Sequence, residues 1–188
     1  LFRSKLIVSG KSLKTLRDGE VINYYSDISD HLDTYTYGLH LLEIIYYFSE
    51  HEHDHQKLYQ FLLKILDKLV LTDEPDVYVM MAELKLLYLL GVQPLFKHCV
   101  HCQSQEGLNF SLEDGGMVCR EHHHGHTFKK ETIELMMQLY YYDLSHPSEL
   151  SYEKQDKIEL RQLIDDYYAY HLNYKSRSRK MLKEMLGY

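Results

Sequence analysis

Three cysteines at residues 99–119 are the side chains whose type and spacing most directly indicate chemistry in this 188-residue chain. Cys99 and Cys102 form the turn CVHC, and Cys119 begins CREH, which ends at His122. Zinc takes four sulfur or imidazole ligands in a tetrahedron, and two intervening residues let both ends of such a turn face one ion. The pattern C-x2-C-x16-C-x2-H therefore predicts a zinc site.

The fourth zinc ligand has several candidates among the histidines that follow Cys119. His122 is preferred because its spacing repeats that of the first pair, but His123, His124 and His126 also follow. Four protein ligands leave no open coordination position, so we expect a structural Zn2+. The alternative is three free, partly buried thiols beside an unrelated histidine. An odd number of cysteines cannot pair completely into disulfides, which favours a reducing, cytoplasmic setting.

Short strands are expected to hold the two halves of this site together. Residues 108–111 and 117–119 read as two strands joined through the turn at residues 113–116, which contains Gly115-Gly116. This places a small zinc-ribbon-like insertion at about residues 96–128.

Helical periodicity dominates the sequence on either side of this insertion. A first helix is expected after Ser29 or Asp30, and Pro75 and Gly91 mark the start and end of a third. The face expected to be buried in the first helix comprises Leu32, Tyr35, Leu39, Leu42 and Tyr46. The other helices are expected at about residues 55–71, 131–142, 152–174 and 178–186. The chain is therefore predicted to be mainly α, with a helical domain at residues 29–188.

Residues 1–28 have a different pattern, in which apolar and polar residues alternate. Asp18-Gly19 is expected to form the turn between two short strands. Two strands cannot bury a core, so we expect them to belong to a larger sheet. Since the chain begins with Leu1 and has no signal-peptide pattern, we expect it to be part of a longer protein.

Charge separates along the chain, which contains 21 basic and 28 acidic residues and has a net charge of −7. Residues 1–17 carry +5 and residues 171–188 carry +4, which leaves −16 on the segment between them. The basic residues proposed to bind DNA or a partner are Arg3, Lys5, Lys11, Lys14, Arg17, Lys175, Arg177, Arg179 and Lys180. Basic ends of this kind can neutralise phosphates, although a solvated charged face is the alternative.

Several classes of protein are disfavoured by what the sequence lacks. No apolar run reaches the length of a membrane helix, and we find no P-loop, G-x-S-x-G or dinucleotide-binding fingerprint. The run HEHDH at residues 51–55 lacks the H-E-x-x-H spacing and is expected to be a solvated link. We therefore expect no enzymatic activity. The 18 tyrosines are expected mainly to pack rather than to stack on bases.

The order of these features resembles that of the RecO family of bacterial recombination mediators, over roughly residues 6–188. The most telling stretches are AELKLLYLLGVQPLFKHCVHC at 82–102, FSLEDGGMVC at 110–119 and HLNYKSRSRKML at 171–182. The stretch LIVSGKSLKTLRDGEVINYY is similar to the end of the family's N-terminal oligonucleotide-binding barrel. One departure is that zinc-bearing members often use four cysteines, whereas this chain has Glu121-His122.

The resemblance implies a DNA-repair protein that binds single- and double-stranded DNA and anneals complementary strands. It also implies contacts with the C-terminal tail of the single-strand-binding protein and with RecR, an indirect role in loading RecA, and a cytoplasmic, nucleoid-associated location without membrane attachment. The alternative hypothesis is a zinc-stabilised helical adaptor that binds only proteins, with its acidic body as the interface.

Overall fold

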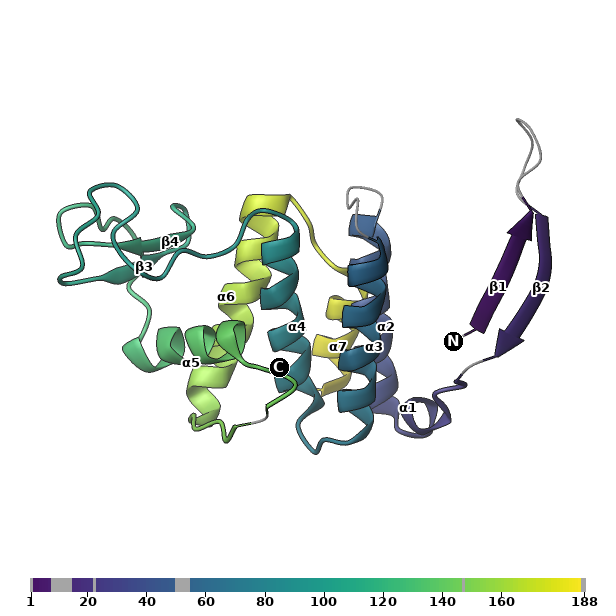
Figure 1. Cartoon of the computed structure of the whole chain (residues 1–188). Helices are drawn as coiled ribbons and strands as arrows, with labels where there is room; N and C mark the ends of the chain where they lie inside the picture. The colour runs from purple at the N-terminus through teal and green to yellow at the C-terminus, as the bar shows by residue number, and fades with distance from the viewer. Residues whose placement is uncertain (1, 8–14, 22, 50–54, 147, 187–188) are drawn as a thin grey trace.

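The computed structural model describes residues 2–7, 15–21, 23–49, 55–146 and 148–186 (Figure 1). The expected mainly α fold is confirmed. The elements, in chain order, are β1 (Phe2–Ile7), β2 (Thr15–Val21), α1 (Ser26–Asp30), α2 (Leu32–Ser49), α3 (His55–Val70), α4 (Pro75–Leu89), β3 (Asn109–Ser111), β4 (Gly116–Val118), α5 (Lys130–Tyr141), α6 (Lys154–Leu172) and α7 (Arg177–Leu186). None of the helices described is long and apolar enough to cross a membrane.

The hairpin of β1 and β2 stands to one side of the helices in Figure 1. Its strands are antiparallel, as expected, but the prediction of a turn at Asp18-Gly19 is wrong, because these residues lie within β2 and pair with Lys5 and Ser4. The register shifts immediately after Lys5, where Arg17 is an extra residue of β2 between the partners of Lys5 and Leu6. The connection between the strands runs through residues 8–14, which lie outside the described residues.

Helix α4 lies at the centre of the helices and is buried on nearly all sides. Pro75 occupies its first turn, and Gly91, just past its end, has a φ of 73°, as the sequence signals predicted. The buried side chains of α4 include Val77, Val79, Met80, Met81, Leu84, Leu86 and Leu87. Helices α2 and α3 pack on one side of α4, and α5 and α6 pack on the other (Figure 1).

The predicted buried face of α2 is wrong. Leu32 and Tyr46 are 68% and 79% exposed, and the three apolar residues between them on this stripe are also exposed. The face that packs inward instead comprises Tyr37, His40, Leu41, Ile44 and Phe48. Helix α2 carries apolar residues on two faces, so periodicity alone did not distinguish them. Packing against α3, α4 and α7 decides which face is buried.

Helices α6 and α7 complete the core. Leu160, Leu163, Ile164 and Tyr168 of α6 are buried, and Leu182 of α7 is buried in the cluster that also contains residues of α2, α3 and α4. The short terminal helix expected from the sequence is confirmed, and it lies along α2. Of the HEHDH run, residues 51–54 lie outside the described residues, and His55 begins α3.

Candidate metal centre

The cysteines lie in a small module between α4 and α5, which we call the cysteine module (residues 95–128; Figure 1). Strands β3 and β4 are antiparallel, with Phe110 opposite Met117. At their turn, the Ser111 hydroxyl donates a 2.6 Å hydrogen bond to Asp114, and Gly115 has a φ of 65°. The two predicted strands are therefore confirmed. Their hairpin returns the chain towards its first two cysteines.

Backbone contacts bind the hairpin to the preceding segment. The amide of Val100 donates to the Met117 carbonyl at 2.9 Å, and the amide of Met117 donates to the Leu95 carbonyl at 2.8 Å. Gly116 permits this approach, because a Cβ atom there would lie 2.7 Å from the Leu95 carbonyl oxygen. The sequence thus places glycine where two backbone segments meet.

The structure brings Cys99, Cys102, Cys119 and His122 together, with one ligand atom of each within 4.8 Å of all the others. The sulfurs of Cys102 and Cys119 are 3.6 Å apart. The Nδ1 atom of His122 lies 3.2 Å from the Cys119 sulfur and 3.7 Å from that of Cys99. Two sulfurs bound tetrahedrally at about 2.3 Å from zinc are separated by roughly 3.8 Å. The donor set therefore fits zinc in both chemistry and spacing.

Hydrogen bonds at the cluster favour a charged sulfur on Cys99. Burial acts to raise the pKa of this thiol, but backbone amides of Cys119, Cys102 and His101 outweigh it and lower the pKa to about 6. At Cys102 the Ser104 amide acts to lower the pKa, yet burial and the other two sulfurs raise it overall. Several thiolates in contact repel one another, and a bound cation removes that conflict.

The other histidines near the cysteines have different surroundings. His101 Nε2 lies 2.9 Å from Asp114, and His126 is largely exposed, with Glu159 4.0 Å away. His123 and His124 are not part of the four-residue cluster found among the described residues. Of the candidates for the fourth ligand, the geometry favours His122.

The cysteine module rests on α6 through polar and aromatic contacts. The Tyr167 hydroxyl lies 3.5 Å from the Gly115 carbonyl oxygen, and His171 Nε2 lies 2.7 Å from the Leu112 carbonyl oxygen. The Phe110 ring is 99% buried and packs 6.4 Å from the Tyr167 ring, between centroids. An ion held by four protein ligands here would fix the module's shape and leave no position for a substrate.

The predicted basic residues are dispersed over the structure. Arg3 and Lys5 lie on β1 and Arg17 on β2, while Lys11 and Lys14 lie outside the described residues. These assignments remain predictions.

At the other end of the chain, Lys175, Arg177 and Lys180 are exposed. Arg179 is 6% exposed, and its Nε donates to Asp165 at 3.3 Å. The predicted surface role therefore does not fit Arg179, because helical periodicity turns its side chain inward while its neighbours point outward. Arg179 holds α7 to α6.

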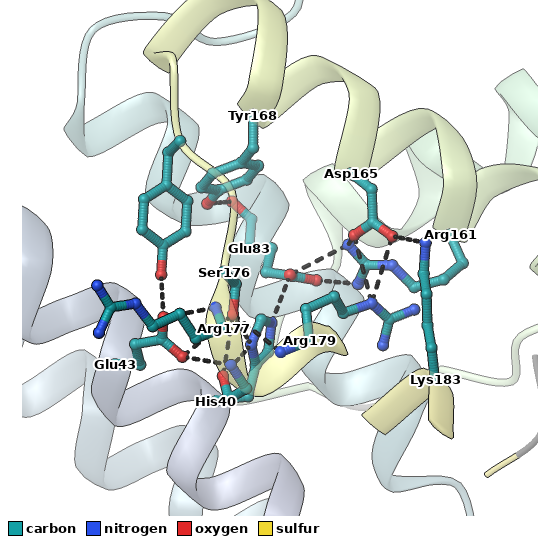
Figure 2. A network of polar contacts seen from close by, with 12 residues as sticks. His40, Glu43, Glu83, Arg161, Asp165, Tyr168, Ser176, Arg177, Arg179 and Lys183 are labelled. Atoms are coloured by element: carbon teal, nitrogen blue, oxygen red, sulfur yellow. Dashed lines mark hydrogen bonds and ion pairs between the residues drawn. The ribbon is translucent and has the colours of Figure 1, made fainter. Parts of the chain in front are cut away.

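Arg179 belongs to a buried ionic network that sequence reasoning missed (Figure 2). Its other members are His40 of α2, Glu83 of α4, Arg161 and Asp165 of α6, and Lys183 of α7, whose Nζ lies 3.1 Å from Asp165. The Arg161 guanidinium binds both carboxylate oxygens of Glu83, and it donates to Asp165 at 2.7 Å. His40 Nε2 lies 2.9 Å from Glu83. One signal in the sequence is Glu83 itself, a single acid within the apolar run of α4.

The network keeps Glu83 ionised although it is 2% exposed. Burial acts to raise the pKa of this carboxyl group, but the charge of Arg161 and the hydrogen bond from His40 lower it to about 2. The Tyr168 hydroxyl also donates to the Glu83 carbonyl at 2.9 Å. Helices α2, α4 and α6 thus meet at the Glu83–Arg161 pair, and α7 joins them through Asp165.

A second carboxylate, that of Glu43 on α2, caps the start of α7 (Figure 2). It accepts hydrogen bonds from the amides of Arg177 at 2.9 Å and Ser178 at 2.8 Å, and from the hydroxyls of Tyr174 and Ser176 at 3.2 Å. Burial acts to raise the Glu43 pKa, but hydrogen bonds from Ser178, Arg177 and Ser176 lower it to about 2. A residue distant in sequence supplies the cap that α7 needs.

Comparison with known proteins supports the resemblance. The family model described as "Recombination protein O C terminal" matches residues 29–180. The DNA repair protein RecO of Bacillus subtilis (strain 168) is 31% identical over 190 residues, which cover 98% of this chain and 74% of that protein. The proteins of the same name from Bacillus pumilus and Bacillus velezensis are 28% and 27% identical over the same shares of each chain. The matched residues 29–180 span the positions of the cysteine module and of His40 to Arg179 in this chain.

Proposed function

The chain belongs to the RecO family, and from this premise we propose that it is a recombination mediator in DNA repair. It binds single- and double-stranded DNA and anneals complementary strands. The observation that carries this proposal is the similarity to proteins named DNA repair protein RecO, which extends over 98% of the chain.

Within this function, the cysteine module has a structural role. Cys99, Cys102, Cys119 and His122 hold one Zn2+, which stabilises a segment with few buried residues of its own. Residues 1–28 form the end of an N-terminal oligonucleotide-binding barrel, and residues 29–188 form the helical domain. The DNA-binding surface includes the basic residues of the N-terminal segment.

The protein acts without catalysing a reaction, through its partners. These are the acidic C-terminal tail of the single-strand-binding protein and RecR, and through them the protein assists in loading RecA. This activity places it in the cytoplasm, at the nucleoid. The exposed basic side chains of Lys175, Arg177 and Lys180 have the charge needed to contact phosphates or an acidic tail.

The test of DNA binding is fluorescence anisotropy of a labelled oligonucleotide at increasing salt. We expect affinity to fall linearly with salt on logarithmic axes, because phosphate binding releases counterions. Absence of binding at low salt would overturn the proposal.

A second candidate function is a protein adaptor without direct DNA binding, and one observation favours it. The exposed stripe of α2, which runs from Leu32 to Tyr46, is the kind of apolar helix face that docks a protein partner. Partner binding by a protein that fails the anisotropy test would establish this alternative.

A further inference from the structure

Two neighbouring tyrosines at the end of α2 are exposed, against the expectation that they pack. The Tyr46 side chain is 79% exposed and that of Tyr47 is 50% exposed. The Tyr47 ring is held in place by the Tyr174 ring, with 4.6 Å between centroids, and by Phe48. The hydroxyl of Tyr174 is fixed in turn by Glu43. The Tyr47 ring is therefore held in place by residues that are themselves fixed.

These tyrosines line a hollow of about 530 Å³ between the end of α2 and the link from α6 to α7, which we call the tyrosine groove. Its lining residues are Glu43, Tyr46, Tyr47, Asn173, Tyr174, Lys175 and Arg177. Among the residues that the structure describes, no Ala, Val, Leu, Ile or Met lines the groove. It offers aromatic rings and polar groups without an enclosed apolar pocket.

The charged groups in the groove are the exposed side chains of Lys175 and Arg177 and the hydrogen-bonded carboxylate of Glu43. Lys175 and Arg177 are exposed, and Figure 2 shows the Arg177 side chain running away from the ionic network around Arg161. The Glu43 carboxylate is ionised, but four donors already surround it. The α7 amides that Glu43 occupies are not available to a ligand, so an incoming anion would meet the two cations.

Aromatic rings beside basic side chains form the arrangement that binds single-stranded nucleic acid. Bases stack on exposed rings whatever their sequence, and the phosphates that link them pair with Lys or Arg. An acidic peptide ending in an aromatic residue needs an apolar pocket for that residue. Among the described residues, the groove presents exposed tyrosine rings and two cations rather than an aliphatic pocket, which favours a nucleic acid over such a peptide.

We propose that the tyrosine groove binds single-stranded DNA, with a base stacked on Tyr46 and the adjoining phosphates paired with Lys175 and Arg177. The inference rests on the proposed function and adds to it a contact on the helical domain, separate from the hairpin.

The experiment uses the absence of tryptophan from this chain. A Tyr46→Trp variant carries a single indole in the groove, and its fluorescence should be quenched when oligo(dT) stacks on it. The matched control is Tyr88→Trp on α4, since Tyr88 is 62% exposed and lies outside the groove. Its fluorescence should stay unchanged while anisotropy of the labelled oligonucleotide shows binding.

Affinity provides a second readout. Tyr46→Ala should raise the Kd for oligo(dT) about tenfold. Arg177→Ala should lower the slope of log affinity against log salt by about 0.7, whereas Lys154→Ala, which removes an exposed cation elsewhere, should not change affinity.

The outcomes separate the two proposals. The unmodified protein could bind DNA while Tyr46→Trp shows no quenching and Tyr46→Ala shows no loss of affinity. That result would overturn the assignment of the groove to DNA and leave the proposed function standing. No binding by the unmodified protein would overturn both. Quenching of Tyr46→Trp by an acidic peptide ending in Phe, but not by oligo(dT), would make the groove a peptide site and overturn its assignment to DNA.

Discussion

The cysteine cluster and the buried ionic network both gather polar side chains, but they differ in how far apart those side chains lie in the sequence. The cluster draws its four residues from positions 99–122, and the network joins residues from His40 to Lys183. The cluster is local, so its spacing reveals it. The network exists only when α2, α4, α6 and α7 pack together.

Their physical roles differ as well. Four ligands around a bound ion would hold a segment with a small core, and the coordination energy would become part of its folding energy. The network sits within a large core, where the cost of desolvating charges offsets much of their attraction. Removing one member of the network should therefore destabilise all the helices that it joins. Removing one member of the cluster should destabilise mainly the cysteine module.

The largest effect is expected from Arg161→Ala. This change leaves the Glu83 carboxylate buried without its main cation, which should lower the free energy of unfolding by about 3–5 kcal/mol. Urea denaturation followed by circular dichroism measures this. The control is Lys130→Ala, which breaks the exposed Lys130–Glu134 pair and should cost less than about 1 kcal/mol. Equal costs for the two variants would contradict the role given to the network.

A more local effect is expected from Cys99→Ser. The variant should lose its zinc and loosen the cysteine module, while α2 and α4 keep their protection against hydrogen exchange. Metal analysis and hydrogen exchange followed by mass spectrometry measure both outcomes. His126→Ala, which removes an exposed histidine outside the cluster, should keep the zinc. Stoichiometric zinc and unchanged thermal stability in Cys99→Ser would show that the ligand assignment is wrong.

The smallest effect is expected from Glu43→Gln, which removes the charge that caps α7. At pH 7 it should lower the free energy of unfolding by about 1 kcal/mol. Because folding lowers the Glu43 pKa from 4.5 to about 2, its stabilisation is complete above about pH 4.5 and is lost as the pH falls towards 2.

The difference in unfolding free energy between the unmodified protein and Glu43→Gln should therefore shrink over that pH range. Urea denaturation at pH 7, 4 and 3 measures it. Glu83 titrates in both proteins and cancels in the comparison. A difference that stays constant with pH would show that the Glu43 charge does not stabilise α7.

Prediction from sequence succeeded where the determining residues are close together. Pro75 and Gly91 mark the start and end of α4 because each acts on its own backbone. The β3–β4 hairpin follows from its turn. Prediction failed for the buried face of α2 and for the turn at Asp18-Gly19. In both cases the sequence allows two local solutions, and the choice depends on residues elsewhere in the chain.

The sequence by itself determined the helices, the zinc ligand spacing and the family, because each depends on residue order over short distances or on similarity along the whole chain. Only the tertiary structure decided that Arg179 is internal while Arg177 is exposed, and that Tyr46 faces solvent while His40 meets Glu83. The physical reason is that the burial of a side chain depends on how the helices pack against one another. A residue's type fixes what it can bind, and its neighbours in space fix whether it is free to do so.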